Sequence, residues 1–156
     1  MELREGGLDH PAVIELLRFH VREANANTPV ANAHALDIDA LRHLAIRFWS
    51  AWDGDTLLGM AALKELEPGH GEVKSMRVHP DHLRRGVASA LLGHIVATAR
   101  GRGYTRLSLE TGTAPAFAPA NALYERAGFV DGPVFGGYPA SEHNRFMTLV
   151  LQEQPA

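Results

Sequence analysis

A strand, a basic loop and a helix follow one another closely between residues 76 and 92. The apolar strand segment ends near Val78, and the loop then carries Arg84, Arg85 and Gly86 directly into an apolar helical run. The first turn of a helix has backbone N–H groups without partners and the positive end of the helix dipole. This order therefore predicts an anion site at the helix start, with two arginines suited to a pyrophosphate. Taken alone, the stretch also fits an ordinary connection with two solvated arginines.

Composition narrows the class of protein. The 156 residues suffice for one domain that buries about two-thirds of its unfolded surface. A net charge of −3 gives no reason to expect nucleic acid as a partner, because duplex-binding proteins carry a broad basic face. The absence of cysteine excludes disulfides, thiolate zinc sites and a cysteine nucleophile. With no membrane-spanning run and no signal peptide, we expect a soluble, cytoplasmic protein without a membrane partner, and a homodimer stays open.

Hydrophobic periodicity and turn residues predict the element order βααβββαβαββ. Strands are expected at residues 2–5, 46–52, 57–66, 72–78, 105–110, 129–134 and 146–151. Helices are expected from Pro11 to a break at 25–29, near Asp37, at 84–100 and at 117–127. An antiparallel meander followed by helix crossovers predicts an α/β (α+β) protein, with a mixed sheet of about six to seven strands and helices on both faces. We expect a single domain over residues 1–151 and a short flexible tail at 152–156.

Three motifs carry a resemblance to a known family. The first is Val-His-Pro at residues 78–80, at a strand end, and the second is Arg-Arg-Gly-Val-Ala at 84–88, which opens the long helix. The third is Asn-Ala-Leu-Tyr-Glu-Arg-Ala-Gly-Phe at 121–129. Together they make the chain similar to the GNAT superfamily of acetyl-CoA-dependent N-acetyltransferases over nearly its whole length. The resemblance implies the acyl-CoA N-acyltransferase (GNAT) fold.

Further segments resemble one bacterial subgroup of small, mostly uncharacterised GNAT acetyltransferases. They are residues 34–37, 72–77, 107–112 and 146–148. The chain departs from the family's phosphate motif at two positions, since Leu83 replaces the usual Gln or Arg and Ala88 replaces a glycine. Because main-chain N–H groups would do most of the binding, we expect phosphate binding to survive. Leu83 removes only one side-chain contribution.

The resemblance also implies where acetyl-CoA, as co-substrate, would bind. It would lie between two splayed strands, one ending at Val78 and the other at Glu110. The backbone of Met76, Arg77 and Val78 would pair with the pantetheine like an extra strand, and an N–H near Val78 would stabilise the oxyanion. The helix start would hold the pyrophosphate, and an Asn and a Tyr of the third motif complete the implied set: Arg84, Arg85, Gly86, Val87, Ala88, Ser89, Asn121 and Tyr124.

Direct attack by an amine needs a base, because an alkyl ammonium with a pKa near ~10.4 must first lose its proton. Glu72 stands fourteen positions before Gly86, an offset that resembles the base glutamate of lysine-acetylating relatives. A surface glutamate paired with Lys74 is the alternative, and Glu110 is a competing base. The resemblance makes Tyr124 the acid that protonates the leaving CoA thiolate. A half-buried packing tyrosine is the alternative there.

The acceptor side is expected along the first helices and the loop before the last strand. His34, Glu110 and Tyr138 are candidate acceptor-binding residues, and ordinary loop packing is the alternative. No metal is expected, because the histidines that follow Val78 lack the spacing of a zinc site.

The leading interpretation is an N-acetyltransferase that moves an acetyl group from acetyl-CoA to a primary amine of a small molecule. The transfer would proceed by direct attack in a ternary complex. Acetylation of a protein lysine or N-terminus is one alternative, and a non-catalytic acyl-CoA-binding sensor is another.

Overall fold

The computed structural model describes residues 1–27, 41–42 and 46–152. The predictions made for His34, for a short helix near Asp37 and for the end of the tail concern residues outside these ranges.

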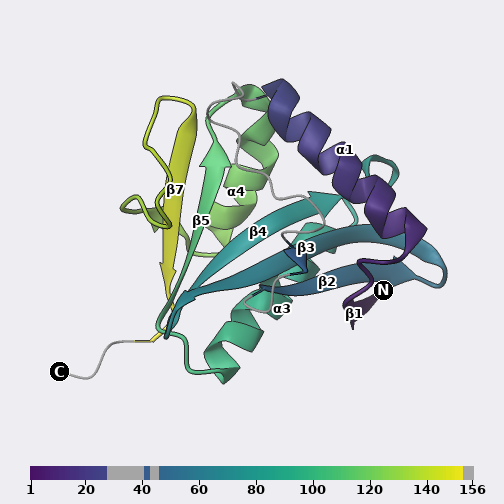
Figure 1. Ribbon diagram of the computed structural model, residues 1–156, viewed down its shortest axis with the longest axis horizontal. Coiled ribbons are helices and arrows are strands. Elements are labelled where there is room, and N and C mark those ends of the chain that lie inside the picture. The colour runs from purple at the N-terminus through teal and green to yellow at the C-terminus, as the bar shows by residue number, and fades with distance from the viewer. Residues whose placement is uncertain (28–40, 43–45, 153–156) are drawn as a thin grey trace.

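A seven-stranded sheet runs through the described part in the order β1-β2-β3-β4-β5-β7-β6 (Figure 1). Its strands are β1 (Glu2–Glu5), β2 (Ile46–Asp53), β3 (Thr56–Glu67), β4 (His70–Val78), β5 (Arg106–Gly112), β6 (Val130–Asp131) and β7 (Asn144–Val150). Only β4 and β5 pair in parallel, and the other neighbours are antiparallel. The predicted mixed sheet is therefore confirmed.

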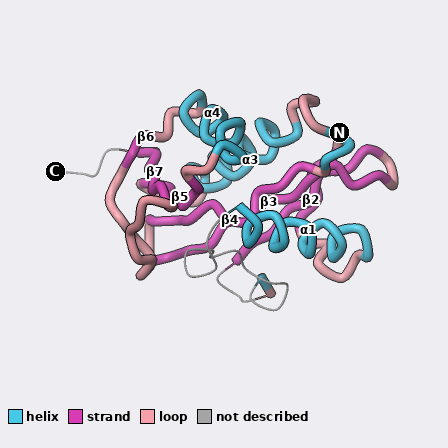
Figure 2. The backbone as a smooth tube through the Cα atoms, turned by 90° about the horizontal axis from the view of Figure 1, so that it is seen from above, coloured by secondary structure: helices cyan, strands magenta, loops and turns pink. Residues whose placement is uncertain are grey.

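Helices cover both faces of this sheet. Helix α1 (Pro11–Asn27) lies on one face, whereas α3 (Val87–Gly101) and α4 (Ala118–Arg126) lie on the other (Figure 2). Two short 3-10 turns, η2 (Pro80–His82) and η3 (Pro115–Phe117), precede the latter two helices. Within the residues searched, which are those described above, no helix is both long and apolar enough to cross a membrane.

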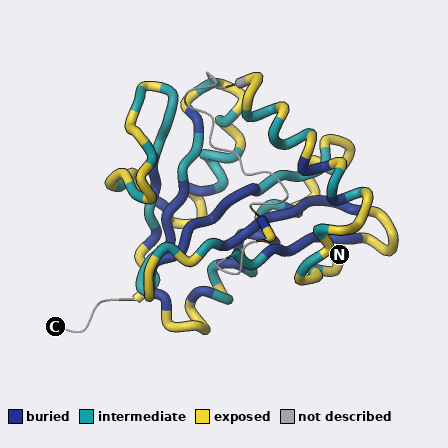
Figure 3. The backbone as a smooth tube through the Cα atoms, in the orientation of Figure 1, coloured by how far each residue is buried: buried dark blue, intermediate teal, exposed yellow. Residues whose placement is uncertain are grey.

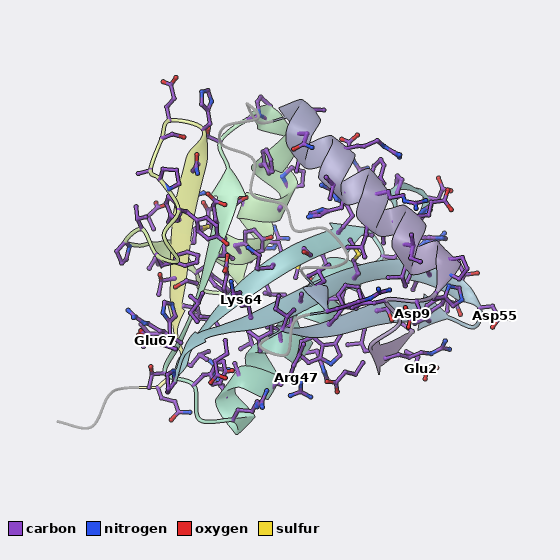
Figure 4. The ribbon with its side chains drawn as sticks, in the orientation of Figure 1. Glu2, Asp9, Arg47, Asp55, Lys64 and Glu67 are labelled. Carbon is purple, nitrogen blue, oxygen red and sulfur yellow. The ribbon has the colours of Figure 1, made fainter. Side chains whose placement is uncertain are left out.

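The strands place alternate side chains on two separate hydrophobic clusters, as the two-residue period of a strand requires. In β2, Phe48 packs in the cluster beneath α1, and its neighbour Trp49 packs in the cluster beneath α3 and α4. Buried backbone accordingly follows the central strands, and the loops are exposed (Figure 3). Charged side chains such as Glu2, Asp9 and Asp55 lie at the end of the molecule that carries the N-terminus, away from β5 (Figure 4).

Two predicted elements have a boundary that was wrong by three residues. The long helix begins at Val87 instead of residue 84, because Arg84 and Gly86 have φ angles of 64° and 76°, which a right-handed helix cannot contain. The strand expected at 129–134 shrinks to Val130–Asp131. Pro133 follows within two residues and has no N–H to donate to a strand partner.

A bulge in β4 changes which side chains face α1. Lys74 pairs with Ala62 and Arg77 pairs with Met60, so β4 has one more residue than β3 between these pairs. The bulge lies at Ser75, whose φ of 54° is in the left-handed region and whose buried hydroxyl makes no hydrogen bond within the described part of the chain. Because Ala62 and Met60 both belong to the cluster beneath α1, Lys74 and Arg77 face α1 as well.

Candidate functional site

A cavity opens where β4 and β5 separate. The two strands pair only over His70–Glu72 and Arg106–Ser108, and beyond this point the β5 side of β4 has no strand partner. The cavity between them has a volume of about 650 Å³. It is lined by β4, the loop and first turn of α3, the end of β5, α4 and the C-terminal part of α1. The splayed strands expected from the family resemblance are therefore present.

The start of α3 forms one end of the cavity. Arg84, Gly86 and the first helical residues, Val87, Ala88 and Ser89, all line it. The N–H of Ala90 is bonded to the carbonyl of Gly86 at 3.0 Å. The three N–H groups before it lie ahead of the first intrahelical bond and are free to bind an anion. No atom lies within 4 Å of the position that a Cβ of Gly86 would occupy.

These features fit a pyrophosphate of coenzyme A. The site combines free N–H groups, the helix dipole and the Arg84 guanidinium in one open concavity. Arg85 takes no part in the lining, since its Nη1 lies 3.1 Å from Nδ1 of His82. Met76, Arg77 and Val78 line the adjoining wall, where the free edge of β4 offers backbone groups to a bound chain.

Tyr124 reaches this cavity from α4. The residue is 8% exposed and packs edge-to-face on Phe129, with 6.0 Å between ring centroids. Burial raises the pKa of Tyr124 to about 12, and the nearby Arg77 cation acts in the opposite direction. The phenol is therefore a permanent hydrogen-bond donor at neutral pH.

Asn121 does not line the cavity. Its Oδ1 accepts from the Thr111 hydroxyl at 2.8 Å, and its Nδ2 donates to the carbonyl of Gly112 at 3.1 Å. The side chain thus joins α4 to the end of β5 and holds Tyr124 beside the splayed strands. The i, i+3 spacing of Asn121 and Tyr124 does not bring both into the cavity.

Glu72, Lys74 and Tyr138 form a hydrogen-bonded cluster on the α1 side of β4. The Nζ of Lys74 donates to Oε2 of Glu72 at 3.1 Å and to the hydroxyl of Tyr138 at 2.5 Å. The Tyr138 hydroxyl also donates to Oε1 of Glu72 at 3.3 Å. Burial and the Glu72 charge raise the pKa of Tyr138. The alternative to a base was a surface glutamate paired with Lys74. Glu72 does pair with Lys74, but it is 1% exposed and lines the cavity instead of the outer surface.

Glu110 enters the same cavity from β5. Its Oε2 accepts from Nδ2 of Asn144 at 2.5 Å. The two candidate bases therefore face one space from opposite strands. Tyr138 is not in contact with the cavity itself and reaches it through Lys74 and Glu72.

Helix α1 supplies a residue that the sequence reasoning missed. His20 lines the cavity, and its Nδ1 accepts from Nε of Arg77 at 3.0 Å. Burial, together with the positive charges of Arg77 and Lys74, lowers the pKa of His20 to about 3. The sequence showed only that His20 belongs to an amphipathic helix. That pattern does not indicate which strand the helix crosses.

His20 should make stability depend on pH. An unfolded histidine takes up a proton below pH ~6.5, whereas folded His20 stays neutral until about pH 3, so the free energy of unfolding falls as pH decreases through this window. Between pH 7 and pH 5, His20 alone should cost about 2 kcal/mol. Urea unfolding at both pH values should show this loss for the wild type and a smaller one for His20→Asn. The buried His70 is present in both proteins, so any pH dependence that it causes is the same in both. An equal loss of unfolding free energy in the wild type and in His20→Asn would therefore contradict a neutral, buried His20.

Comparison with known proteins decides the family. The profile described as Acetyltransferase (GNAT) family matches residues 13–129. The chain belongs to this family. It is 44% identical over 151 residues to the uncharacterized N-acetyltransferase YedL of Escherichia coli (strain K12), covering 97% of this chain and 95% of YedL. It is 45% identical over 151 residues to the uncharacterized N-acetyltransferase YsnE of Bacillus subtilis (strain 168), covering 97% of this chain and all of YsnE.

The fold of this GNAT protein is also that of solved acetyltransferase structures. The Salmonella typhimurium protein yncA, solved with its cofactor acetyl-CoA, is 21% identical and superimposes with a TM-score of 0.75. The alignment covers 99% of this chain and 96% of yncA. The expected family, the expected fold class and the expectation of an acetyltransferase enzyme are thus confirmed.

Proposed function

We propose that this GNAT acetyltransferase moves an acetyl group from acetyl-CoA to the primary amine of a small molecule, by direct attack in a ternary complex. The observation that carries the proposal is the cavity that joins a helix-start anion site to the carboxylates of Glu72 and Glu110 and to a protonated tyrosine. Both substrates can meet there without a covalent enzyme intermediate. Calorimetric titration with acetyl-CoA and thiol release across a panel of amines test the proposal. Tight binding without thiol release from any amine would favour an acyl-CoA sensor.

In this proposal, each wall of the cavity binds one part of acetyl-CoA or stabilises the reacting atoms. The N–H groups of residues 87–89 and Arg84 bind the diphosphate, and the free edge of β4 binds the pantetheine. An N–H of that edge stabilises the negative charge on the thioester oxygen as the amine adds. The neutral amine nitrogen forms the new C–N bond and gives up a second proton as the C–S bond breaks. The sulfur leaves as a thiolate that accepts a hydrogen bond from Tyr124, and the released proton converts it to the free thiol.

Glu72 receives the proton of the acceptor ammonium in this proposal. Both of its carboxylate oxygens already accept hydrogen bonds, from Lys74 and Tyr138, which fixes the orientation of the carboxylate. An incoming ammonium would add to this cluster as a second cation beside Glu72. Glu110, on the facing strand, is the competing base.

Glu72→Gln should lower kcat/KM for an amine about a hundredfold, because general base catalysis contributes roughly 10²–10⁴-fold. Affinity for acetyl-CoA should be unchanged, and the activity that remains should rise with pH as free amine accumulates. Glu110→Gln is the matched variant from the opposite strand. A larger loss and a steeper pH dependence in Glu110→Gln would assign the base role to Glu110.

A further inference from the structure

Arg77 places a cation in the acceptor wall, and its two outer nitrogens make no hydrogen bond to the residues that the structure describes. A guanidinium has five N–H donors. In the described part of the chain, the Arg77 side chain makes one hydrogen bond, from Nε to His20. We propose that the two outer nitrogens of Arg77 bind a carboxylate of the acceptor, which makes the acceptor an amino acid rather than a simple amine. The inference rests on the proposed function and names its substrate class.

The Arg77 side chain is held before any ligand binds. Its Nε is anchored on Nδ1 of His20 at 3.0 Å, and its guanidinium lies over the ring of Phe19, with 5.6 Å from Cζ to the ring centroid. These two contacts hold the guanidinium beside His20, and both Arg77 and His20 line the cavity. A planar, preoriented fork of this kind matches the two oxygens of a carboxylate.

The charges around Arg77 also favour an incoming anion. Burial lowers the pKa of Arg77, so the cation is incompletely compensated where it lies, although Glu23 of α1 acts in the opposite direction. Burial, together with the positive charges of Arg77 and Lys74, lowers the pKa of His20 and keeps it neutral. Lys74, the other cation on this face, is already engaged by Glu72 at 3.1 Å. Arg77 is therefore the cation available to a ligand carboxylate.

The direction of the side chain assigns it to the acceptor rather than to the cofactor. Met76 and Val78, on either side of it, pack against the cluster beneath α3, near the helix start that fits the diphosphate. Arg77 points to the opposite face, toward Phe19 and His20 of α1. The bulge at Ser75 is the cause. If side chains alternated regularly from Val73 to Arg77, both residues would lie on the same face of β4.

Glu72 and Arg77 then form the two ends of one binding site. Both lie on the α1 face of β4, at opposite sides of the bulge, and their Cα atoms are at most about 16 Å apart along an extended strand. Both residues line the same cavity, so a ligand between the ends of their long side chains can be shorter than this distance. An acceptor with its amine near Glu72 and its carboxylate on Arg77 is a zwitterion. The experiment varies the number of atoms between these two groups.

The test uses matched probes that differ only in the anionic group. Glycine, β-alanine, 4-aminobutyrate, 6-aminohexanoate and L-phenylalanine are each compared with their carboxamides, by thiol release from acetyl-CoA. The wild type should show a KM about tenfold to a hundredfold lower for the acid than for the amide in at least one pair. Arg77→Gln should raise KM for the acid to the value for the amide, which abolishes this difference. Arg77→Lys, which keeps charge but not the fork, should retain part of it.

Two further variants separate positioning from folding. His20→Asn keeps an acceptor for Nε of Arg77 and should retain the acid preference, whereas His20→Leu should weaken it. Arg106→Gln is the matched control, since Arg106 pairs with Glu67 at the other end of the sheet and should change neither KM. Thermal melts check that each variant is folded.

Several results would overturn the inference. One is a fall in kcat for acid and amide alike in Arg77→Gln with the KM difference kept, which would mean that Arg77 acts only on the reaction step near Tyr124. Others are a loss of coenzyme A affinity in that variant, or no acid preference in the wild type. If no amine releases thiol, the proposed function fails separately. Calorimetric titration of the same acids and amides into the coenzyme A complex then decides whether Arg77 binds carboxylates.

Discussion

Gly86→Glu is expected to abolish binding of acetyl-CoA, with a loss of affinity of at least about a hundredfold. Gly86 has a φ of 76° and lies immediately before the three free N–H groups of α3. A side chain at this position would project into open space at the mouth of the anion site. A carboxylate there would occupy the position of the phosphates and repel them.

Two control variants separate charge from backbone strain. Gly86→Ala has the same left-handed φ penalty, about 1–2 kcal/mol, but no charge, so it should cost stability and much less affinity. Gly93→Ala, on the exposed face of the same helix, should leave binding unchanged and stabilise the protein slightly. Calorimetry measures the affinities. Normal affinity in Gly86→Glu would contradict placement of the diphosphate at this helix start.

Most of the fold, and the anion-binding end of the site, could be predicted from patterns among residues that are neighbours in sequence. The alternating strands around Phe48 and Trp49 and the four-residue spacing of Val87, Leu91 and Ile95 each follow from the residues that must be buried. The anion site could be predicted for the same reason, because it depends on one loop and the helix turn next to it. Its residues are neighbours in sequence.

The acceptor side could not be predicted because it depends on contacts between distant segments. The bulge at Ser75 inverts the alternation of β4, and nothing in the residue types around it indicates an extra residue. The approach of His20 to Arg77 depends on where α1 crosses the sheet. Asn121 lies one turn before Tyr124, yet the nearby end of β5 takes its amide.

Tyr124→Phe is expected to lower kcat about a hundredfold and to leave the affinity for acetyl-CoA unchanged, because one hydrogen-bond donor to developing charge is lost. Tyr124 lines the cavity, and its hydroxyl keeps its proton since burial raises its pKa to about 12. A free thiol has a pKa near ~8.5, so complete transfer of this proton to the leaving thiolate is uphill by roughly 5 kcal/mol. Tyr124 is therefore expected to stabilise the sulfur chiefly by donating a hydrogen bond, with Arg77 lowering the cost.

Tyr104→Phe is the matched control for this variant. Tyr104 is also a buried tyrosine, 5% exposed, and burial raises its pKa as well, but it packs in the core beneath α3 and does not line the cavity. It should leave kcat unchanged, so a hundredfold loss in Tyr124→Phe alone would tie the effect to the position of the hydroxyl. Steady-state kinetics with an accepted amine and calorimetry with acetyl-CoA measure both quantities. A fall in affinity with kcat intact would make Tyr124 a binding residue, because a donor to the leaving sulfur acts only once the C–S bond begins to break.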